Sequence, residues 1–440
     1  MQKSLKIVLV FVLLSCLTAS ALGNTTVYGS EKTDAPFRWR TRTIHIAVSG
    51  SLLQTSNIKD DSDVLGAVRR SLEAWGEAAD IDLQETTSDK RNVSPAGNAG
   101  DGVSLITVAP TAENALLFAG NAEDVAATTR VFFDRKGFIT EADIVLNPYQ
   151  QFSTDGTFGT FDLESTLTHE IGHLLGLDHS PMLGSTMHEN YGKNGIYGIQ
   201  NFAPRTLAEL DRNLIRAKYG SPGDDGKCCG VVNGELLDPN GLPAKGVELW
   251  AEDARTGKVH AELTTNSTGA FLFNGLPYGT YKIYSQKIRE PKNSIPSQEI
   301  GEVRIENDEG VTFTRRLSVR PDDIEVKYLG FNGQLSGLAV PVNAGKTYTI
   351  YLGGKNLNRN NISVRFNSPF LTIVPNSFAS HDYGEDLSVV SFDLSAAPRT
   401  PIGEYSVFVD SVGGGRSVVI GGIAVRKFLN PLSNIILGDE

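Results

Sequence analysis

One segment constrains the fold of this chain more than any other: residues 169–179, with the sequence HEIGHLLGLDH. His169 and His173 are four positions apart, so on an α-helix they project from one face and both imidazoles can bind one ion. Gly176 can adopt the left-handed conformation that ends a helix, which lets the chain return His179 toward the first two histidines. The segment therefore predicts a helix, a sharp turn and a site with three histidine nitrogens.

Three neutral histidine nitrogens leave one position of a tetrahedral zinc ion open. Water bound there is acidified toward neutral pH, which distinguishes a catalytic zinc site from a closed structural one. Glu170 follows the first histidine, so its carboxylate can reach this water as a general base. A buried helix with hydrogen-bonded histidines is the alternative, but it would need neither Gly176 nor His179. We predict one catalytic zinc ion, held by His169, His173 and His179.

The extended motif resembles the zinc helix of the metzincin metallopeptidases, and Ser180 after the third histidine gives the ending typical of their matrixin branch. Metzincins carry a methionine in a tight turn beneath the metal. Met187 lies eight residues after His179, the separation that matrixins use. A methionine that only fills a gap in a core is the alternative. The resemblance implies a zinc endopeptidase that hydrolyses internal peptide bonds, with Met187 and Gly176 as structural residues beneath the metal.

The flanking segments predict three helices. Apolar residues recur at helical spacing after Asp162, which can cap the zinc helix, and again over residues 64–75. A third helix is expected to begin with a capping box of Thr206 and Glu209 and to end before Gly220.

Short β-rich runs predict a mostly parallel sheet under these helices, with strands at residues 43–48, 103–108, 128–133 and 142–146. Together the elements of residues 36–220 resemble the matrixin catalytic domain, an α+β fold with a twisted mixed sheet. The resemblance implies that a peptide substrate would lie extended and antiparallel along an edge strand. We expect residues 128–133 to supply that edge.

The remaining histidines depart from the pattern of animal matrixins, which hold a second, structural zinc with three further histidines. Outside the motif the chain has His45, His188, His260 and His381, and only the first two lie in this domain. A second zinc is therefore not expected. His45 is predicted to be a packed or half-exposed strand residue. His188 is predicted to be a solvated turn residue, and a position near the pocket is the alternative, because it directly follows Met187. The sequence gives no support for a structural Ca²⁺ ion.

The N-terminus predicts a secretory signal peptide over residues 1–23. Lys3 and Lys6 precede the apolar run 7–14 and the small residues 19–21. This apolar run is too short to span a bilayer, so we expect a secreted, extracellular protein without a transmembrane segment. Lipid anchoring through Cys16 is the alternative, because the residues before it imperfectly resemble a bacterial lipoprotein processing site.

Charge and cysteine content limit the partners. The formal net charge is −11, and loss of residues 1–23, with two lysines and no acidic residue, would change it to −13. Such a charge argues against nucleic acid or an anionic membrane as a partner. The adjacent Cys228 and Cys229 cannot link distant segments, and either two thiols or a vicinal disulfide would fit. We expect a monomer.

Composition changes after Gly220, and short alternating strands between turns predict two further β-sandwiches, at residues 226–319 and 323–427. The run GLPYGTY at 275–281 resembles carboxypeptidase regulatory-like (transthyretin-like) domains, and PIGEY at 401–405 resembles immunoglobulin-like domains. Neither region carries a catalytic cluster. Two interpretations stay open: spacer or stability modules, and modules that bind a surface, a glycan or a protein substrate.

The sequence thus predicts a multidomain protein, an α+β metzincin catalytic domain followed by two β-sandwich domains. Its predicted function is that of a secreted zinc metalloendopeptidase acting on protein substrates, with Glu170 as general base. The alternative is a catalytically idle metalloprotease-like protein that binds a surface, a glycan or a protein. The presence of Glu170 argues against this alternative, because loss of the base is a common route to inactivity.

Overall fold

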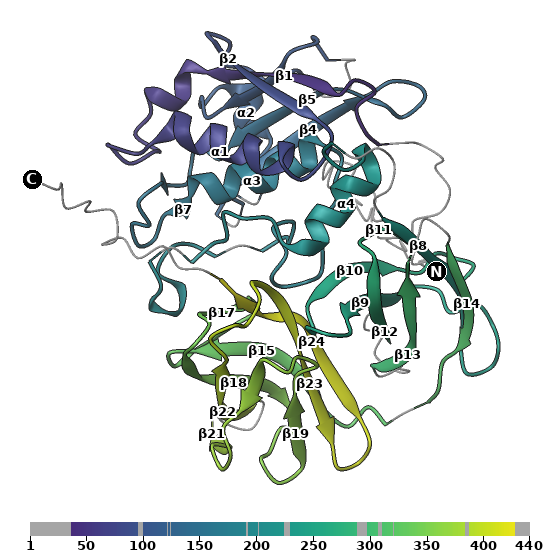
Figure 1. The fold of residues 1–440 in the computed structure, drawn as a ribbon. Coiled ribbons are helices and arrows are strands. Elements are labelled where there is room, and N and C mark those ends of the chain that lie inside the picture. The colour runs from purple at the N-terminus through teal and green to yellow at the C-terminus, as the bar shows by residue number, and fades with distance from the viewer. Residues whose placement is uncertain are drawn as a thin grey trace, which may run out of the picture.

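The computed structural model of this chain describes residues 37–426 except 96–99, 121, 124, 191, 201, 224–228, 288–296, 307–309, 320 and 383–386. The predicted signal segment, Cys16 and Cys228 lie outside the described residues; Cys229 is disulfide-bonded. Over the part of the chain that is described, no helix has the length and apolar character needed to cross a membrane. Figure 1 shows a mixed N-terminal domain above two regions built from strands.

The N-terminal domain is built on a five-stranded sheet with the strand order β2-β1-β3-β5-β4. β1, β2, β3 and β5 are parallel, and the edge strand β4 is antiparallel to β5. The mostly parallel sheet and the edge position of residues 128–133 agree with the prediction. The strands are β1 (Thr43–Ser49), β2 (Asp82–Ser88), β3 (Ser104–Thr107), β4 (Ala127–Phe133) and β5 (Ile139–Leu146).

Strand β2 was not predicted. Its sequence, DLQETTS, contains a single apolar residue, and none of its seven residues is buried. A strand at the sheet edge needs only backbone pairing on one side, so hydrophobic alternation does not reveal it.

Helix α3 (Leu163–Leu174), which carries His169 and His173, packs beside α1 (Val64–Gly76) against the sheet (Figure 1). Trp75 of α1 is fully buried, and its indole Nε1 donates a hydrogen bond of 2.8 Å to the carbonyl oxygen of Thr168 in α3. The short helix α2 (Ala112–Leu116), the 3₁₀ turns η1 (Gly50–Leu53) and η2 (Ile196–Gly198), and the strand pair β6 (Phe152–Ser153) and β7 (Phe161–Asp162) complete the domain.

The last helix of this domain, α4 (Glu209–Tyr219), ends at Gly220 as predicted, with φ of 85° at that glycine. Its predicted capping box of Thr206 and Glu209 is wrong. The helix begins after Ala208, whose N–H donates to the Asp211 carboxylate at 3.2 Å. Asp211 lies three residues into the helix region, so it can reach back to the cap position from inside the first turn.

The middle sandwich (residues 230–316) consists of two sheets with the orders β10-β9-β12-β13 and β11-β8-β14. Side chains of both sheets share one core, including Val232 and Phe273 from one sheet and Leu249 and Ile283 from the other. The strands are β8 (Gly230–Leu237), β9 (Val247–Asp253), β10 (Val259–Thr264), β11 (Ala270–Leu276), β12 (Gly279–Lys287), β13 (Gln298–Ile305) and β14 (Val311–Arg316).

The C-terminal sandwich (residues 325–425) has sheets of order β16-β15-β18-β22-β20, with β21 also paired to β22, and β17-β24-β23-β19. Two β-sandwiches after an α+β domain agree with the predicted fold class. The strands are β15 (Glu325–Phe331), β16 (Gln334–Ser336), β17 (Val340–Val342), β18 (Thr347–Lys355), β19 (Ile362–Arg365), β20 (Leu371–Ile373), β21 (Ala379–Asp382), β22 (Ser388–Ala396), β23 (Gly403–Ser411) and β24 (Arg416–Val425).

Both sandwiches use the same tyrosine contact at one corner. The hydroxyl of Tyr281 donates to the carbonyl oxygen of Pro277 at 2.8 Å, and that of Tyr405 donates to the carbonyl oxygen of Pro401 at 2.7 Å. Each tyrosine ring is buried, so the bond to a nearby carbonyl satisfies its hydroxyl without water. The two sequence runs singled out for their resemblances therefore have one physical role in common.

The three units are joined by buried contacts. Helix α4 packs on β10 and β11 of the middle sandwich, and Figure 1 shows it directly above these strands. Asn367 of the C-terminal sandwich donates to Oε2 of Glu252 in the middle sandwich at 2.6 Å. The N-terminal domain therefore packs against the middle sandwich, and the middle sandwich packs against the C-terminal one.

Candidate metal centre

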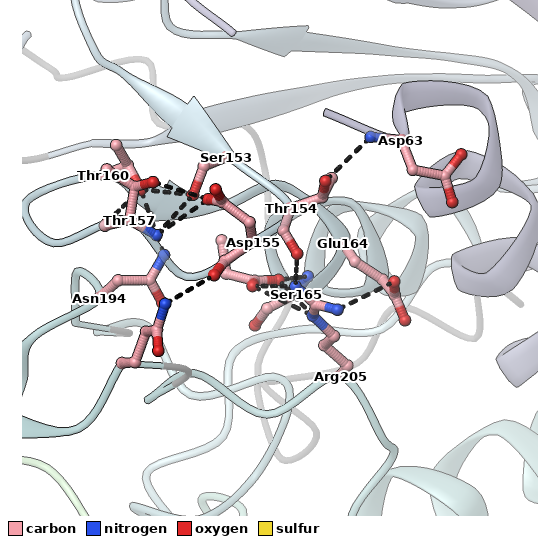
Figure 2. Close-up of polar contacts among 12 residues, drawn as sticks. Asp63, Ser153, Thr154, Asp155, Thr157, Thr160, Glu164, Ser165, Asn194 and Arg205 are labelled. Carbon is pink, nitrogen blue, oxygen red and sulfur yellow. Dashed lines mark hydrogen bonds and ion pairs between the residues drawn. The ribbon is translucent and has the colours of Figure 1, made fainter. Parts of the chain in front are cut away.

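The start of helix α3 is fixed by a group of polar side chains. Asp162 caps the helix by accepting a hydrogen bond from the N–H of Ser165 at 2.9 Å. Arg205 binds the same carboxylate through Nη2 at 2.6 Å and also donates to the carbonyl oxygen of Thr154 at 2.6 Å. Figure 2 shows Arg205 between Thr154, Ser165 and Glu164 at this helix start. Arg205 belongs to the segment that follows the three histidines. Its ion pair with Asp162 therefore joins this segment to the first turn of α3 and helps to fix the position of the helix start.

Helix α3 ends in the turn that the sequence predicts. Gly176 has φ of 86°, and a Cβ atom there would collide with the carbonyl oxygen of Phe37. The N–H of Leu177 donates to the carbonyl oxygen of Gly172 at 2.9 Å. The N–H of Gly176 donates to the carbonyl oxygen of His173 at 2.8 Å. These two bonds form a Schellman motif, which satisfies the last carbonyls of the helix and reverses the chain.

The turn brings the three predicted histidines together. Nε2 of His173 lies 3.1 Å from Nε2 of His169 and 3.1 Å from Nε2 of His179. Nitrogens that bind one tetrahedral zinc at about 2.0–2.1 Å lie about 3.3 Å from each other. The spacing of the three nitrogens therefore fits a single zinc ion.

Hydrogen bonds to carbonyl oxygens fix the tautomer of two of these rings. Nδ1 of His169 lies 2.8 Å from the carbonyl oxygen of Thr186, and Nδ1 of His173 lies 2.9 Å from that of Leu177. A carbonyl oxygen can only accept, so Nδ1 carries the proton in both rings and Nε2 keeps a free lone pair. Such carbonyl partners orient a metal-binding imidazole and raise its basicity.

Burial keeps the inner histidines neutral. Both His169 and His173 are buried, and burial lowers the pKa of each, that of His173 to about 3. His179 reaches the surface, but partial burial also lowers its pKa. Neutral imidazoles are the form that binds zinc, so no proton has to be displaced at neutral pH.

Glu170 follows His169 in helix α3 and is buried. Its Oε2 accepts a hydrogen bond of 2.6 Å from the hydroxyl of Thr129 on the edge strand β4. Burial raises the pKa of the Glu170 carboxyl to about 7. Sequence reasoning did not identify Thr129, because a threonine within a strand carries no signal that separates it from its neighbours.

The loop 180–188 follows the third histidine and carries Met187. The methionine is buried, and its Sδ lies so close to Gly172 of α3 that a Cβ atom there would collide with it. Ser180 closes the loop by donating its N–H to the carbonyl of Met187 at 2.8 Å. The carboxylate of Asp211 in helix α4 accepts a hydrogen bond from Ser185 Oγ at 2.6 Å and one from the N–H of Thr186 at 2.8 Å. Asp211 therefore holds the residue whose carbonyl orients His169, and it too was missed by sequence reasoning.

The solvated position predicted for His188 is wrong, and the alternative position near the pocket agrees better with the structure. Its side chain is buried, and its Nδ1 lies 3.0 Å from the carbonyl oxygen of Ser180, which closes the loop a second time. Burial lowers the pKa of His188. His45 was predicted to be packed or half-exposed, but it is exposed on β1, because its side chain alternates with the buried Ile44 and Ile46. Across the described residues, His169, His173 and His179 form the one group of at least three His, Cys, Asp or Glu side chains that could hold a metal.

Comparison with known protein families gives a match over this same domain. Residues 38–220 match the family model described as Matrixin. The match and the histidine group together support a matrixin catalytic domain, and this family implies a zinc metallopeptidase. No curated protein matches the chain.

Solved structures similar to parts of the chain are remote. The major pilin subunit BcpA of Bacillus cereus is 15% identical over 45% of this chain and 69% of the pilin, with a TM-score of 0.18. The major pilin SpaA of Corynebacterium diphtheriae is 12% identical over 41% of this chain and 62% of its own, with a TM-score of 0.16. Catechol 1,2-dioxygenase from Pseudomonas arvilla C-1 is 13% identical over 22% of this chain and 54% of the dioxygenase, with a TM-score of 0.17. Scores this low support no conclusion about this chain.

Proposed function

We propose that the chain is a secreted zinc endopeptidase that hydrolyses internal peptide bonds of protein substrates. The observation that carries the proposal is the convergence of three Nε2 atoms beside a buried glutamate. His169, His173 and His179 would hold the zinc, with Gly176 and Met187 shaping the turn and the floor of the site. Bound zinc supplies Lewis acidity toward the scissile carbonyl and toward one water.

Glu170 moves the protons. Thr129 donates to Oε2 of Glu170 and so orients the carboxylate, which would accept the proton of the attacking water and then pass it to the leaving amine. A carboxyl whose pKa is raised to about 7 holds that proton more readily than an exposed glutamate at neutral pH. The buried position therefore suits both the base and the acid half of the reaction.

Strand β4 would bind the substrate. Among the described residues it pairs only with β5, so its other edge has backbone groups available to an extended peptide. A peptide added along this edge would pass beside Thr129, which contacts Glu170 directly. Main-chain pairing of this kind recognises internal segments of unfolded or extended proteins without requiring a particular side chain.

The test is hydrolysis of casein by the purified full chain, with Glu170→Gln as the variant and Glu73→Gln as the matched control. Glu73 is an exposed residue of α1, so the same chemical change there should leave activity unaltered. We expect the parent and Glu73→Gln to cleave, and Glu170→Gln to bind zinc without cleaving. If zinc-loaded parent cleaves none of several unrelated protein substrates, the alternative of an idle domain on a binding protein replaces this proposal.

A further inference from the structure

The loop 180–188 touches two of the three histidines that would bind zinc. It begins directly after His179, and the carbonyl oxygen of its Thr186 accepts the Nδ1 proton of His169 at 2.8 Å. Its two ends are joined by the bond from Ser180 N–H to the Met187 carbonyl. His169 and His173 are both carried by helix α3, so a displacement of this loop would move His179 relative to them and would also shift the carbonyl that orients the His169 ring.

The outer side of the same loop is held by the middle sandwich. Oγ of Ser180 donates to Oε2 of Glu262 on strand β10 at 3.0 Å. Glu262 is buried beside Glu248 of strand β9, and Oε2 of Glu248 accepts from Nε2 of Gln286 at 2.7 Å. Burial raises the pKa of Glu262 well above its ordinary value, with Glu248 as a further cause, so the two carboxyl groups can share a proton. Ser180 and Glu262 are both buried, so water does not compete for the hydrogen bond between them.

Apolar contacts hold Met182, two residues further along the loop. Met182 is fully buried in a cluster that spans all three units of the chain. Its other members include Leu210 of α4, Trp250 and Tyr284 of the middle sandwich, and Phe408 and Ile420 of the C-terminal sandwich.

The C-terminal sandwich also approaches the loop backbone. The N–H of Leu183 donates to the carbonyl oxygen of Ile420 at 3.3 Å. A Cβ atom on Gly184 would collide with Cγ of Glu404 and lie 3.0 Å from the carbonyl oxygen of Gly421. Only a glycine lets the two backbones come this close. Three consecutive loop residues are therefore held by the two sandwiches.

We propose that the two sandwiches are structural parts of the zinc site, and that Glu262 is a positioning residue for His179, acting through Ser180. The inference rests on the proposed function for the identity of the metal. It goes beyond the roles expected of the sandwiches, because they would shape the zinc site itself and would not merely space or stabilise the domain or bind a separate ligand. A loop held in its metal-binding shape before zinc arrives loses less conformational freedom on binding, which tightens the complex.

The experiment compares three variants of the full chain: Glu262→Ala, Glu262→Gln and Glu252→Ala. Glu252 is the matched control, because it is also a buried glutamate of the middle sandwich, and its carboxylate accepts from Trp250 and Asn367, which lie outside the loop. The zinc dissociation constant is measured by competition with a chelator of known affinity, and the unfolding temperature is measured on the same samples.

We expect Glu262→Ala to raise the zinc dissociation constant about 10-fold, the lower end of the effect of partners that orient metal ligands. Glu262→Gln keeps an oxygen that can accept from Ser180, so its constant should stay within about twofold of the parent. Glu252→Ala should lower the unfolding temperature and leave zinc affinity unchanged. Equal zinc affinity in Glu262→Ala and the parent, or an equal loss in Glu262→Ala and Glu252→Ala, would overturn the proposal.

Should Glu262→Ala fail to fold, Ser180→Ala removes the same hydrogen bond from the loop side, together with the bond from Met182 N–H to Ser180 Oγ, and leaves the sandwich intact. It is expected to weaken zinc binding in the same direction, and unchanged affinity would count against the proposal. Zinc affinity is read without any substrate. A parent chain that binds zinc but cleaves nothing would therefore refute the proposed peptidase while the comparison of variants still decides this inference.

Discussion

The hydroxyl of Thr129 lies 2.6 Å from Oε2 of Glu170 and 3.1 Å from the carbonyl oxygen of the same residue. One side chain of the edge strand thus contacts both the backbone and the carboxylate of the proposed general base. The strand that would bind substrate and the residue that would move the proton are held at a fixed separation by this contact.

Replacing Thr129 by valine should therefore reduce turnover more than substrate binding. Valine keeps the branched shape but cannot donate a hydrogen bond, and a bond to a charged group contributes about 1.5–3 kcal/mol. We expect kcat for a peptide substrate to fall about 10-fold or more, with a smaller change in KM. Thr129→Ser restores the donor and should recover most of the rate. A valine variant with the parental kcat would show that the bond does not position Glu170.

Removal of the metal gives a second prediction. A chelator should abolish hydrolysis, and added zinc should restore it. Zinc at 100 times its dissociation constant should stabilise the folded chain by about 2.7 kcal/mol, visible as a higher unfolding temperature. His179→Gln should lose this shift, because it removes one of the three converging nitrogens. His45→Gln, at an exposed site in the same domain, is the control and should keep it. A thermal shift that survives in His179→Gln would place the metal elsewhere.

The parts of the site that sequence predicts are those in which neighbours in the chain act on each other. Helical spacing places His169 and His173 on one face, and Gly176 makes the turn within three residues. These relations depend only on local backbone geometry.

Partners from distant segments could not be predicted. Thr129 is 41 residues from Glu170, Asp211 is 26 from Ser185, and Glu262 is 82 from Ser180. Which strand or helix arrives at a given side chain depends on tertiary packing, and a buried glutamate in a strand looks like an exposed one in the sequence. The solvated position predicted for His188 was wrong for the same reason.

Tyr197 is the extreme case. It follows the loop in the N-terminal domain, yet it is fully buried in the core of the C-terminal sandwich. Its hydroxyl lies 2.6 Å from Oγ of Ser336, 139 residues away in the chain. The predicted domain boundaries separate these two residues, and no local pattern indicates that they meet.

Gly172 offers a test of the packing beneath the metal. A Cβ atom there would collide with Sδ of Met187 and lie 2.9 Å from Cζ2 of Trp75. Gly172→Ala should therefore destabilise the chain by about 1–3 kcal/mol, the usual cost of overfilling a core. Gly76→Ala is the control, since its Cβ would be 3.7 Å from the nearest atom, an ordinary contact. Denaturant unfolding measures both. If the two alanine variants are equally stable, Met187 does not pack against α3 as described.

The last prediction concerns pH and Glu404, a buried residue of β23 beside the loop. Burial raises the pKa of its carboxyl to about 7, although the nearby Arg426 and Lys258 oppose the shift and Asp211 adds to it. A carboxyl with a raised pKa in the folded state contributes stability at low pH, and this contribution is lost as the pH rises through about 7.

Glu404→Gln removes this titration. Between pH 5 and pH 8 the parent should therefore lose about 2 kcal/mol more unfolding free energy than the variant. The comparison uses the difference between the two pH values for each protein, because glutamine also changes the field at Arg426 and so alters absolute stability at any one pH. Denaturant unfolding at both pH values gives the four free energies needed. Parallel pH dependence in parent and variant would mean that Glu404 is ionised in the folded chain across this whole interval.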